Sequence, residues 1–374
     1  MTIYKGPISY RNWRAALEEK PSTIVYEYPL FTDSHIIGEI MEGYGPYQFL
    51  NTIPIFRPVV APSIVLRVSN HIPIEEVTKV EMNKTDASHY HGGELCDEIA
   101  ALLSLNLGIR FKAGDLTREF RINSDPKGHP CHYFSGGNPT LNYSTRGQML
   151  PYSKGSRRVN DAKLLMNLPS LKPHDATALL KAARLYQDAI WISESEPALA
   201  WLLLVSSVET AAGHWRKKKE LPVERLKAFN KDLVEVLAHS GGESLVETVA
   251  NAISDVIGST KKFIDFLIEH LPPPPETRPA LFIQHPWEVE AFKKSFKAIY
   301  TWRSNALHGG ISFPLPMCEP PMKFENFFAE KPFGLATGAK GAVWVAKDTP
   351  MLLHLFEYIV RNSLIKWWNS LNLN

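Results

Sequence analysis

The spacing of apolar residues changes near residue 160 of this chain. Before that point, apolar and β-branched residues occur in short runs between frequent prolines and glycines, which is typical of strands. From Pro173 onward, apolar residues recur every three or four positions over long stretches, which is typical of amphipathic helices. We therefore predict an α+β chain of two domains, with a β-rich module over residues 1–160 and an all-α helical bundle over residues 161–374.

Within the N-terminal half, the pattern predicts strands, one helix and one hairpin. The helix is expected over 94–106, where the apolar residues have helical spacing and Gly108 follows as a stop. The hairpin is expected to join 109–112 to 119–122 around a glycine turn. The strands are expected at 23–28, 54–59, 64–68 and 78–82.

Within the C-terminal half, the pattern predicts helices throughout. Asp175 is expected to cap the first helix, and Gly213 is expected to follow the end of the second. Residues 124–158 show no sustained period and many glycines and prolines, so we expect an interdomain connection or a long functional loop there. The helices are expected over 175–193, 196–212, 222–238, 244–257, 260–270, 286–307 and 349–368.

Composition agrees with an ordinary globular protein. The chain has 374 residues, of which 44% are hydrophobic and 21% are charged, and a formal net charge of only +2 excludes a global basic field. Its cysteines, Cys96, Cys131 and Cys318, are too scattered for a disulfide framework and fit a reducing compartment. The N-terminus lacks the apolar core of a secretory signal, and the apolar run at 198–208 is too short to cross a membrane. We expect a soluble, cytoplasmic protein without a membrane partner.

An arginine and a histidine stand near the end of the penultimate long helical pattern. In the segment IYTWRSNALHGG, Arg303 and His308 precede Gly309 and Gly310, and these two glycines are expected to end the helix. Side chains five positions apart point about 140° from each other on an ideal helix. The pair can therefore share one site only if the helix ends between them, or if a second copy of the chain completes the site.

The two side-chain types suggest a reaction. A guanidinium that grips phosphate and an imidazole that exchanges protons near neutral pH are the groups needed to cleave RNA through its 2′-hydroxyl, without a metal. The competing interpretation is structural: His308 complements the helix dipole and Arg303 pairs with a carboxylate of the bundle. A second such pair, Arg278 and His285, lies in a proline-flanked connector, where we expect no rigid element to hold it.

The segment IYTWRSNALHGG resembles the R-x(4–6)-H signature of HEPN domains, in particular that of the ApeA-like group. The upstream apolar segment WLLLVSSVETAAG is similar to that group's helix ending in a glutamate. The resemblance covers about residues 170–374, and HGGELCDEIAALLSLNLGIRF is a weaker echo of the β-rich module that can precede such a domain. It implies a metal-independent endoribonuclease of prokaryotic antiphage defence (abortive infection) and toxin systems, which acts as a homodimer with both motifs at the interface.

The resemblance also implies roles for individual residues. Arg303 would stabilise the phosphorane, and His308 would be the general acid and base. The family often has Asn, Asp or His directly after the arginine. Here Ser304 stands at that position and Asn305 follows, so either could take the orienting role. Glu209 would orient Arg303, or alternatively form a simple ion pair within the bundle.

The resemblance implies RNA as the substrate, no cofactor, and an N-terminal module that senses a phage-derived trigger or restrains the nuclease. Some HEPN domains bind without cutting, so the alternative function is a catalytically silent module that binds RNA or protein.

Motifs of other enzyme classes are missing from the sequence: there is no Walker A loop, no G-x-S-x-G elbow and no H-E-x-x-H.

Two further groups of residues offer weaker signals. The basic runs at 154–158 and 216–219 are candidate contacts to a phosphate backbone, or simply solvated loops. Several histidines and cysteines have the chemistry of metal ligands, but their spacing is not that of a recognised zinc motif. Scattered loop histidines and a core thiol are the competing explanation. These metal-compatible residues are His89, His91, Cys96, His129, Cys131 and His132.

Overall fold

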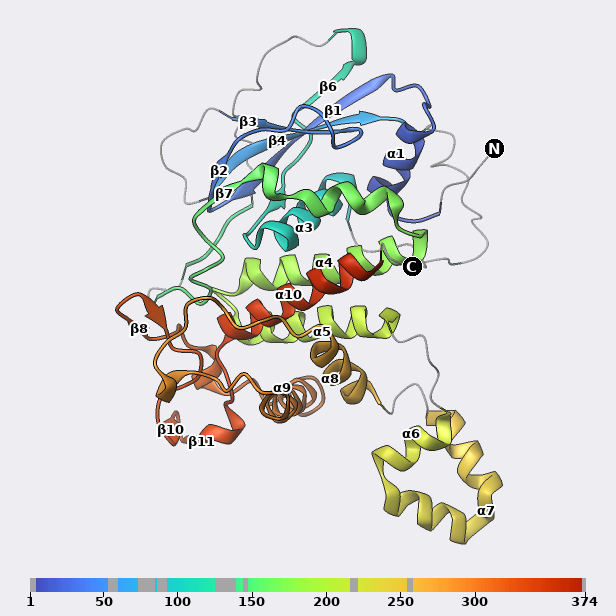
Figure 1. Ribbon diagram of the computed structural model, residues 1–374, viewed down its shortest axis with the longest axis vertical. Helices are drawn as coiled ribbons and strands as arrows, with labels where there is room; N and C mark the ends of the chain where they lie inside the picture. The colour runs from blue at the N-terminus through green and yellow to red at the C-terminus, as the bar shows by residue number, and fades with distance from the viewer. Residues whose placement is uncertain are drawn as a thin grey trace.

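The computed structural model describes residues 5–52, 60–72, 85, 93–124, 139–143, 147–215, 221–253 and 258–371. It confirms a mixed α+β chain, with a β-containing N-terminal region and a helical C-terminal part. Figure 1 shows the sheet at one end of the molecule and successive layers of helices beneath it.

A five-stranded antiparallel sheet forms the N-terminal layer, in the order β3-β4-β1-β5, with β6 also paired to β1. The predicted strands 23–28 and 64–68 are confirmed, since 24–28 lie in β1 and all of 64–68 lies in β4. The predicted strands 54–59 and 78–82 lie outside the described residues. The strands are β1 (Ile24–Thr32), β3 (Tyr47–Asn51), β4 (Ala61–Asn70), β5 (Lys112–Ala113) and β6 (Arg118–Arg121).

The predicted hairpin between 109–112 and 119–122 is wrong. β5 pairs with Leu30 and Phe31 of β1, while β6 pairs with Ile24–Glu27, so the two segments form one interrupted edge strand. Glu27 explains the register at β6, because its buried carboxylate accepts hydrogen bonds from Arg118 on this edge and from Arg67 on the other neighbouring strand. These charge-assisted contacts favour pairing with β1 over a local turn.

Two helices accompany the sheet, α1 (Ile8–Leu17) and α3 (Leu95–Leu107). The helix α3 lies directly beneath the sheet in Figure 1 and ends at Gly108, whose φ of 64° is left-handed, so the predicted stop is confirmed. The helix α1 was not predicted. Its first turn is capped by the buried carboxylate of Glu98 on α3, which accepts hydrogen bonds from the backbone N–H groups of Ile8 and Ser9 at 2.9 and 2.7 Å.

The C-terminal half contains the predicted run of helices with changed boundaries. α5 continues through Gly213, where a stop was predicted. The predicted helices 222–238 and 244–257 are instead the short α6 and the long α7, which is interrupted at Gly241 and Gly242. The helices are α4 (Pro173–Ile192), α5 (Pro197–Trp215), α6 (Pro222–Phe229), α7 (Lys231–Ile253), α8 (Ser259–Glu269), α9 (Val289–Gly309) and α10 (Leu353–Leu371).

The helices form two groups. α4, α5, α8, α9 and α10 contribute to one hydrophobic core, whereas α6 and α7 pack on each other around Leu226, Val234, Val246 and Ala250. Figure 1 shows the pair of α6 and α7 set apart from the other helices. Within the described ranges, no helix combines the length and apolar character needed to cross a bilayer.

The C-terminal half is not all-α as predicted. Two short hairpins interrupt it between α9 and α10, in a segment rich in proline and aromatic residues whose strands are too short to give a period. A third small sheet lies within the N-terminal half, where β7 pairs in parallel with β2. These strands are β2 (His35–Ile37), β7 (Ser156–Arg158), β8 (Lys323–Phe324), β9 (Phe327–Phe328), β10 (Ala336–Ala339) and β11 (Ala342–Val345).

A buried arginine ties the sheet layer to the helices. Arg110, which is 1% exposed, donates hydrogen bonds to Asp33 and Glu194 at 2.9 and 2.7 Å, and to the carbonyl oxygen of Ile190 at the end of α4. α3 also packs against α4, and residues on both sides of position 160 share one hydrophobic core. The predicted domain boundary at residue 160 therefore falls within continuous packing.

Candidate functional site

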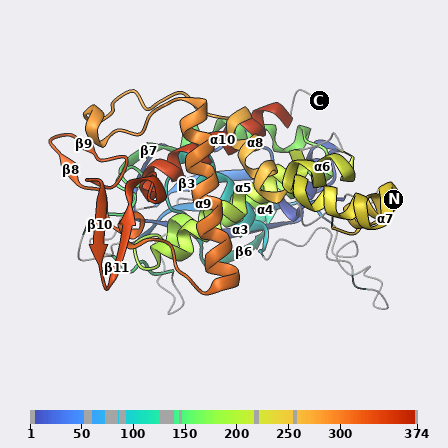
Figure 2. The ribbon, with the colours of Figure 1, turned by 90° about the horizontal axis from the view of Figure 1, so that it is seen from below.

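Helix α9 lies beneath α5, on the side of the helices that faces away from the sheet, and in Figure 2 it runs across the face towards the viewer. Its inner side is anchored by Phe292, Phe296 and Ile299, which are fully buried. Near its C-terminus, the indole N–H of Trp302 donates a hydrogen bond of 2.7 Å to the carbonyl oxygen of Asp348. The last turns of α9 are therefore held in a defined position and orientation.

Arg303 of α9 forms an ion pair with Glu209 of α5. The arginine Nη2 lies 2.8 Å from Oε2 of the glutamate, and each side chain is 21% exposed. The other carboxylate oxygen of Glu209 accepts a hydrogen bond of 2.8 Å from the hydroxyl of Tyr300. The contact fits both interpretations of Glu209, as a residue that orients Arg303 and as an interhelical ion pair.

Tyr300 completes this small network. Its ring centroid lies 5.4 Å from the guanidinium carbon of Arg303, within the range of a cation–π contact. Burial, followed by the hydrogen bond to Glu209, raises the pKa of Tyr300 to about 12, so its hydroxyl remains a donor at neutral pH. The buried Nε of Arg303 has no hydrogen-bond partner among the described residues. This N–H is closed to solvent, so any contact of the guanidinium with a substrate would use its exposed part.

The helix continues through both motif residues. The stop predicted at the two glycines is confirmed, because α9 includes Gly309 and ends at Gly310, whose φ of 64° is left-handed. The carbonyl oxygen of Asn305 accepts the hydrogen bonds from Gly310 and Ile311 that close the helix. Because the helix does not end between Arg303 and His308, their side chains keep the angular separation of about 140° that an ideal helix gives.

His308 is exposed in the last turn of α9, and its ring has no hydrogen-bond partner among the described residues. On an ideal helix, Ser304 points about 100° from Arg303 and lies between it and His308, whereas Asn305 points about 160° from Arg303 and lies beyond His308. Ser304 therefore has the better position of the two candidate orienting residues. Leu307 and Ile311, which are 52% and 56% exposed, place apolar surface beside the histidine.

The second arginine–histidine pair is held rigidly, contrary to expectation, but it faces inward. Arg278 donates two hydrogen bonds to Glu330 and stacks on Trp287 at 4.8 Å. His285 is 3% exposed and hydrogen-bonded to Ser295 at 2.8 Å, and burial lowers its pKa to about 4. The pair is therefore part of the packed interior.

Most of the metal-compatible residues predicted in the N-terminal half lie outside the described residues, namely His89, His91, His129, Cys131 and His132. Cys96 is described and lies in α3, where it is 5% exposed. Burial raises the pKa of its thiol to about 12. Its surroundings are those of a core thiol, which was the competing explanation.

One of the two basic runs makes contacts within the protein. Residues 216–219 lie outside the described residues. In the run 154–158, the guanidinium of Arg157 donates to the carbonyl oxygens of Leu107, at the end of α3, and of Tyr152. Arg157 therefore stabilises a helix C-terminus, while Arg158 remains exposed.

One cluster was not predicted. Asp175 was expected to cap α4, but the residue at the cap position is Lys172, and Asp175 instead contacts His174 and His214. No local spacing could reveal this group, because His214 is 39 residues from Asp175 in the chain.

No protein-family model, no curated protein and no solved structure matches this chain. The likeness to HEPN domains therefore rests on the residues of α5 and α9 described above.

Proposed function

We propose that this protein is a metal-independent endoribonuclease with a HEPN-like helical domain, and that Arg303 and His308 carry its chemistry. The observation that carries the proposal is the ion pair between Glu209 and Arg303 near the end of α9, followed on the same helix by an exposed histidine. The arginine is oriented from a neighbouring helix, and the histidine is accessible to a substrate.

In the proposed reaction, His308 takes the proton of the RNA 2′-hydroxyl, and the 2′-oxygen attacks the adjacent phosphorus. Arg303 donates hydrogen bonds to the phosphate oxygens as negative charge develops in the phosphorane. The bond from phosphorus to the 5′-oxygen then breaks, and an imidazolium returns a proton to the leaving oxygen. The products are a 2′,3′-cyclic phosphate and a 5′-hydroxyl end.

We propose a homodimer in which two copies of the α9 terminus meet. Within one chain the side chains of Arg303 and His308 point about 140° apart, so a second copy offers the simplest completion of the site. Exposed Leu307 and Ile311 supply apolar surface for such a contact, and a two-fold axis would use the same surface on both chains.

On the same resemblance, we propose that the nuclease is an effector of antiphage defence, with the N-terminal region sensing a phage-derived trigger or restraining cleavage. This part of the proposal is tested in cells. Expression of the wild type should be toxic in a way that depends on Arg303 and His308, and phage infection should increase RNA cleavage.

The test of the activity uses purified protein and RNA in the presence of EDTA. The wild type should cut RNA and leave 2′,3′-cyclic phosphate ends, and His308→Ala should remove the activity without lowering the melting temperature, because the side chain is exposed. His239→Ala is the matched control, since His239 is an exposed histidine on α7. If His308→Ala cuts as well as the wild type, the assignment is wrong.

The same assays separate the alternative, a catalytically silent binding module. Such a module would shift RNA or a partner protein in a binding assay but leave the RNA intact. Its toxicity, if any, would be indifferent to the Arg303→Ala and His308→Ala substitutions.

A further inference from the structure

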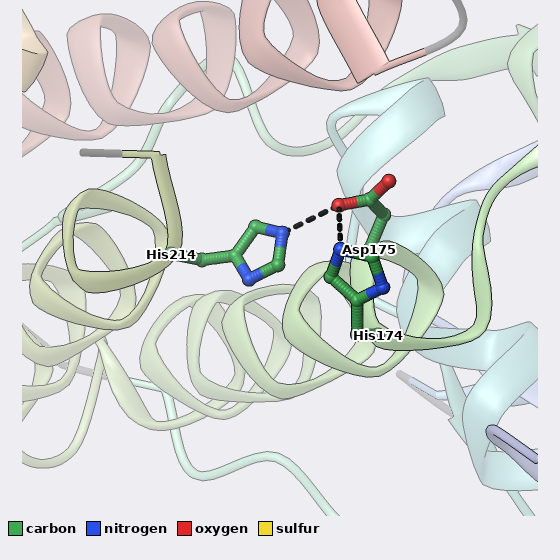
Figure 3. A group of neighbouring side chains, drawn as sticks. All are labelled: His174, Asp175 and His214. Atoms are coloured by element: carbon green, nitrogen blue, oxygen red, sulfur yellow. Dashed lines mark hydrogen bonds and ion pairs between the residues drawn. The ribbon is translucent and has the colours of Figure 1, made fainter. Parts of the chain in front are cut away.

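Three potential metal ligands meet where the start of α4 lies beside the end of α5. Figure 3 shows His174 and Asp175, from the first turn of α4, turned towards His214 in the last turn of α5. Oδ1 of Asp175 lies 2.6 Å from Nε2 of His214 and 3.3 Å from Nε2 of His174. All three donor atoms lie within 4.8 Å of one another.

These spacings suit one small divalent cation. Zinc binds imidazole nitrogen and carboxylate oxygen at about 2.0–2.2 Å, so two ligands at a tetrahedral angle lie about 3.3 Å apart. The distance from Asp175 to His174 already has that value, at 3.3 Å. The shorter contact of 2.6 Å to His214 is a direct hydrogen bond, which would lengthen by less than about 1 Å to admit the ion.

The surroundings of the three groups also fit a bound ion. Asp175 is held inside the protein with its side chain 7% exposed, and the side chain of His214 is 19% exposed and packs edge-on against Trp367. His174 faces solvent, with its side chain 64% exposed. One side of the cluster is therefore open, so that water can occupy a fourth ligand position.

We propose that His174, Asp175 and His214 form a zinc site with two imidazole ligands, one carboxylate and one water. A purely structural explanation exists for part of the cluster, because a carboxylate near a helix N-terminus and a histidine near a helix C-terminus each complement a helix dipole. That explanation accounts for the bond between Asp175 and His214. It does not account for the exposed ring of His174 directed at the same carboxylate oxygen.

The ion would link the start of α4 to the end of α5. Glu209 stands on α5 within two helical turns of His214, so zinc would stabilise the segment that holds the partner of Arg303. No step of the proposed RNA cleavage uses the ion. The inference does not rest on the proposed function.

The experiment uses the full-length protein after removal of metal with a chelator. Zinc chloride is titrated in competition with a chromophoric chelator, the melting temperature is followed with increasing zinc, and cobalt(II) serves as a spectroscopic probe. The wild type should bind one zinc per chain, melt at a higher temperature with zinc, and give the visible absorption of tetrahedral cobalt. Native-state binding raises the melting temperature in a concentration-dependent way.

Substitutions locate the ion. His174→Ala should fold normally because the side chain is exposed, and it should weaken zinc binding at least about tenfold. Asp175→Asn keeps the size of the side chain and should abolish the cobalt spectrum, whereas His239→Ala on α7 should behave as the wild type.

Two outcomes would overturn the proposal. A wild type that binds no zinc and whose melting temperature ignores zinc would leave a hydrogen-bonded cluster only. Zinc binding that is as tight in His174→Ala and Asp175→Asn as in the wild type would place the ion elsewhere. The zinc site and the proposed nuclease can fail separately. RNA cleavage in EDTA by a protein that binds no zinc would overturn only the zinc site, and zinc binding by a protein that does not cleave RNA would overturn only the nuclease.

Discussion

Arg303 and Glu209 are 94 residues apart in the sequence, yet Nη2 of the arginine lies 2.8 Å from Oε2 of the glutamate. The other oxygen of the same carboxylate binds the hydroxyl of Tyr300, one turn before the arginine. The carboxylate thus contacts two successive turns of α9 and fixes the direction of the guanidinium. Under the proposed function, Glu209 is a positioning residue that acts through Arg303.

Glu209→Gln should therefore lower RNA cleavage while largely preserving the fold. Loss of the charge removes the force that orients Arg303, and a misplaced catalytic group costs roughly 10- to 100-fold in rate. Stability should fall by only about 1 kcal/mol, because the pair is partly exposed and screened by solvent. Steady-state cleavage of a fluorogenic RNA and thermal melting measure the two effects.

Glu290→Gln is the matched control, since Glu290 forms a salt bridge with Lys293 on the exposed side of the same helix. Cleavage rates of Glu209→Gln equal to those of this control would show that Glu209 is only an interhelical ion-pair partner. Tyr300→Phe keeps the ring and should show a smaller loss than Glu209→Gln.

A mixture of Arg303→Ala and His308→Ala chains tests whether the site is shared between two copies. Each variant alone should be inactive. If each site takes its arginine from one chain and its histidine from the other, a mixed dimer keeps one intact site, and random mixing restores about a quarter of wild-type activity. If both residues of a site come from one chain, the mixture remains as inactive as its components.

Arg110→Met should destabilise the protein strongly. The substitution leaves the buried carboxylates of Asp33 and Glu194 without their cation, which costs about 3–5 kcal/mol. Urea unfolding of the two proteins measures the change in the free energy of unfolding, provided that both show the same dependence of that free energy on urea concentration. Lys293→Ala is the control, because it removes an ion pair on the solvent-exposed surface of α9 and should leave the free energy of unfolding nearly unchanged. A cost below about 1 kcal/mol for Arg110→Met would contradict this account of the buried network.

Stability should also decline in weak acid because of His354. This histidine is buried in α10, and burial lowers its pKa to about 3. Below about pH 6.5 the unfolded chain binds a proton on His354, whereas the folded chain does not. The free energy of unfolding is therefore unaffected by this residue above about pH 6.5 and decreases as the pH falls towards the pKa of His354 in the folded protein. The loss is about 1.4 kcal/mol for each pH unit in that window.

His354→Gln, which cannot titrate, should reduce the slope of unfolding free energy against pH between about 6.5 and 4 by one proton. The control is His35→Gln, since His35 is exposed on β2. Equal slopes in the wild type and in His354→Gln would mean that the residue is already protonated, or accessible, in the folded protein. Part of the slope should remain, because burial also lowers the pKa of His285 to about 4.

Local sequence was sufficient for the features that are encoded over a few adjacent residues. Apolar periodicity located α3 to within one residue at each end, and Gly108 marked its stop, because helix formation and termination depend on neighbouring side chains and local backbone freedom. The candidate motif of Arg303 and His308 was also visible, since both residues lie on one helix.

The packing of the whole chain decided which distant segments meet. Three contacts join residues that are far apart in the chain. They are the pairing of β5 and β6 with β1, the ion pair of Glu209 with Arg303, and the meeting of His174 and Asp175 with His214. Such contacts depend on how the helices and the sheet pack. Neither propensity nor spacing contains that information, because the pairing energy arises only after the core has brought the elements together.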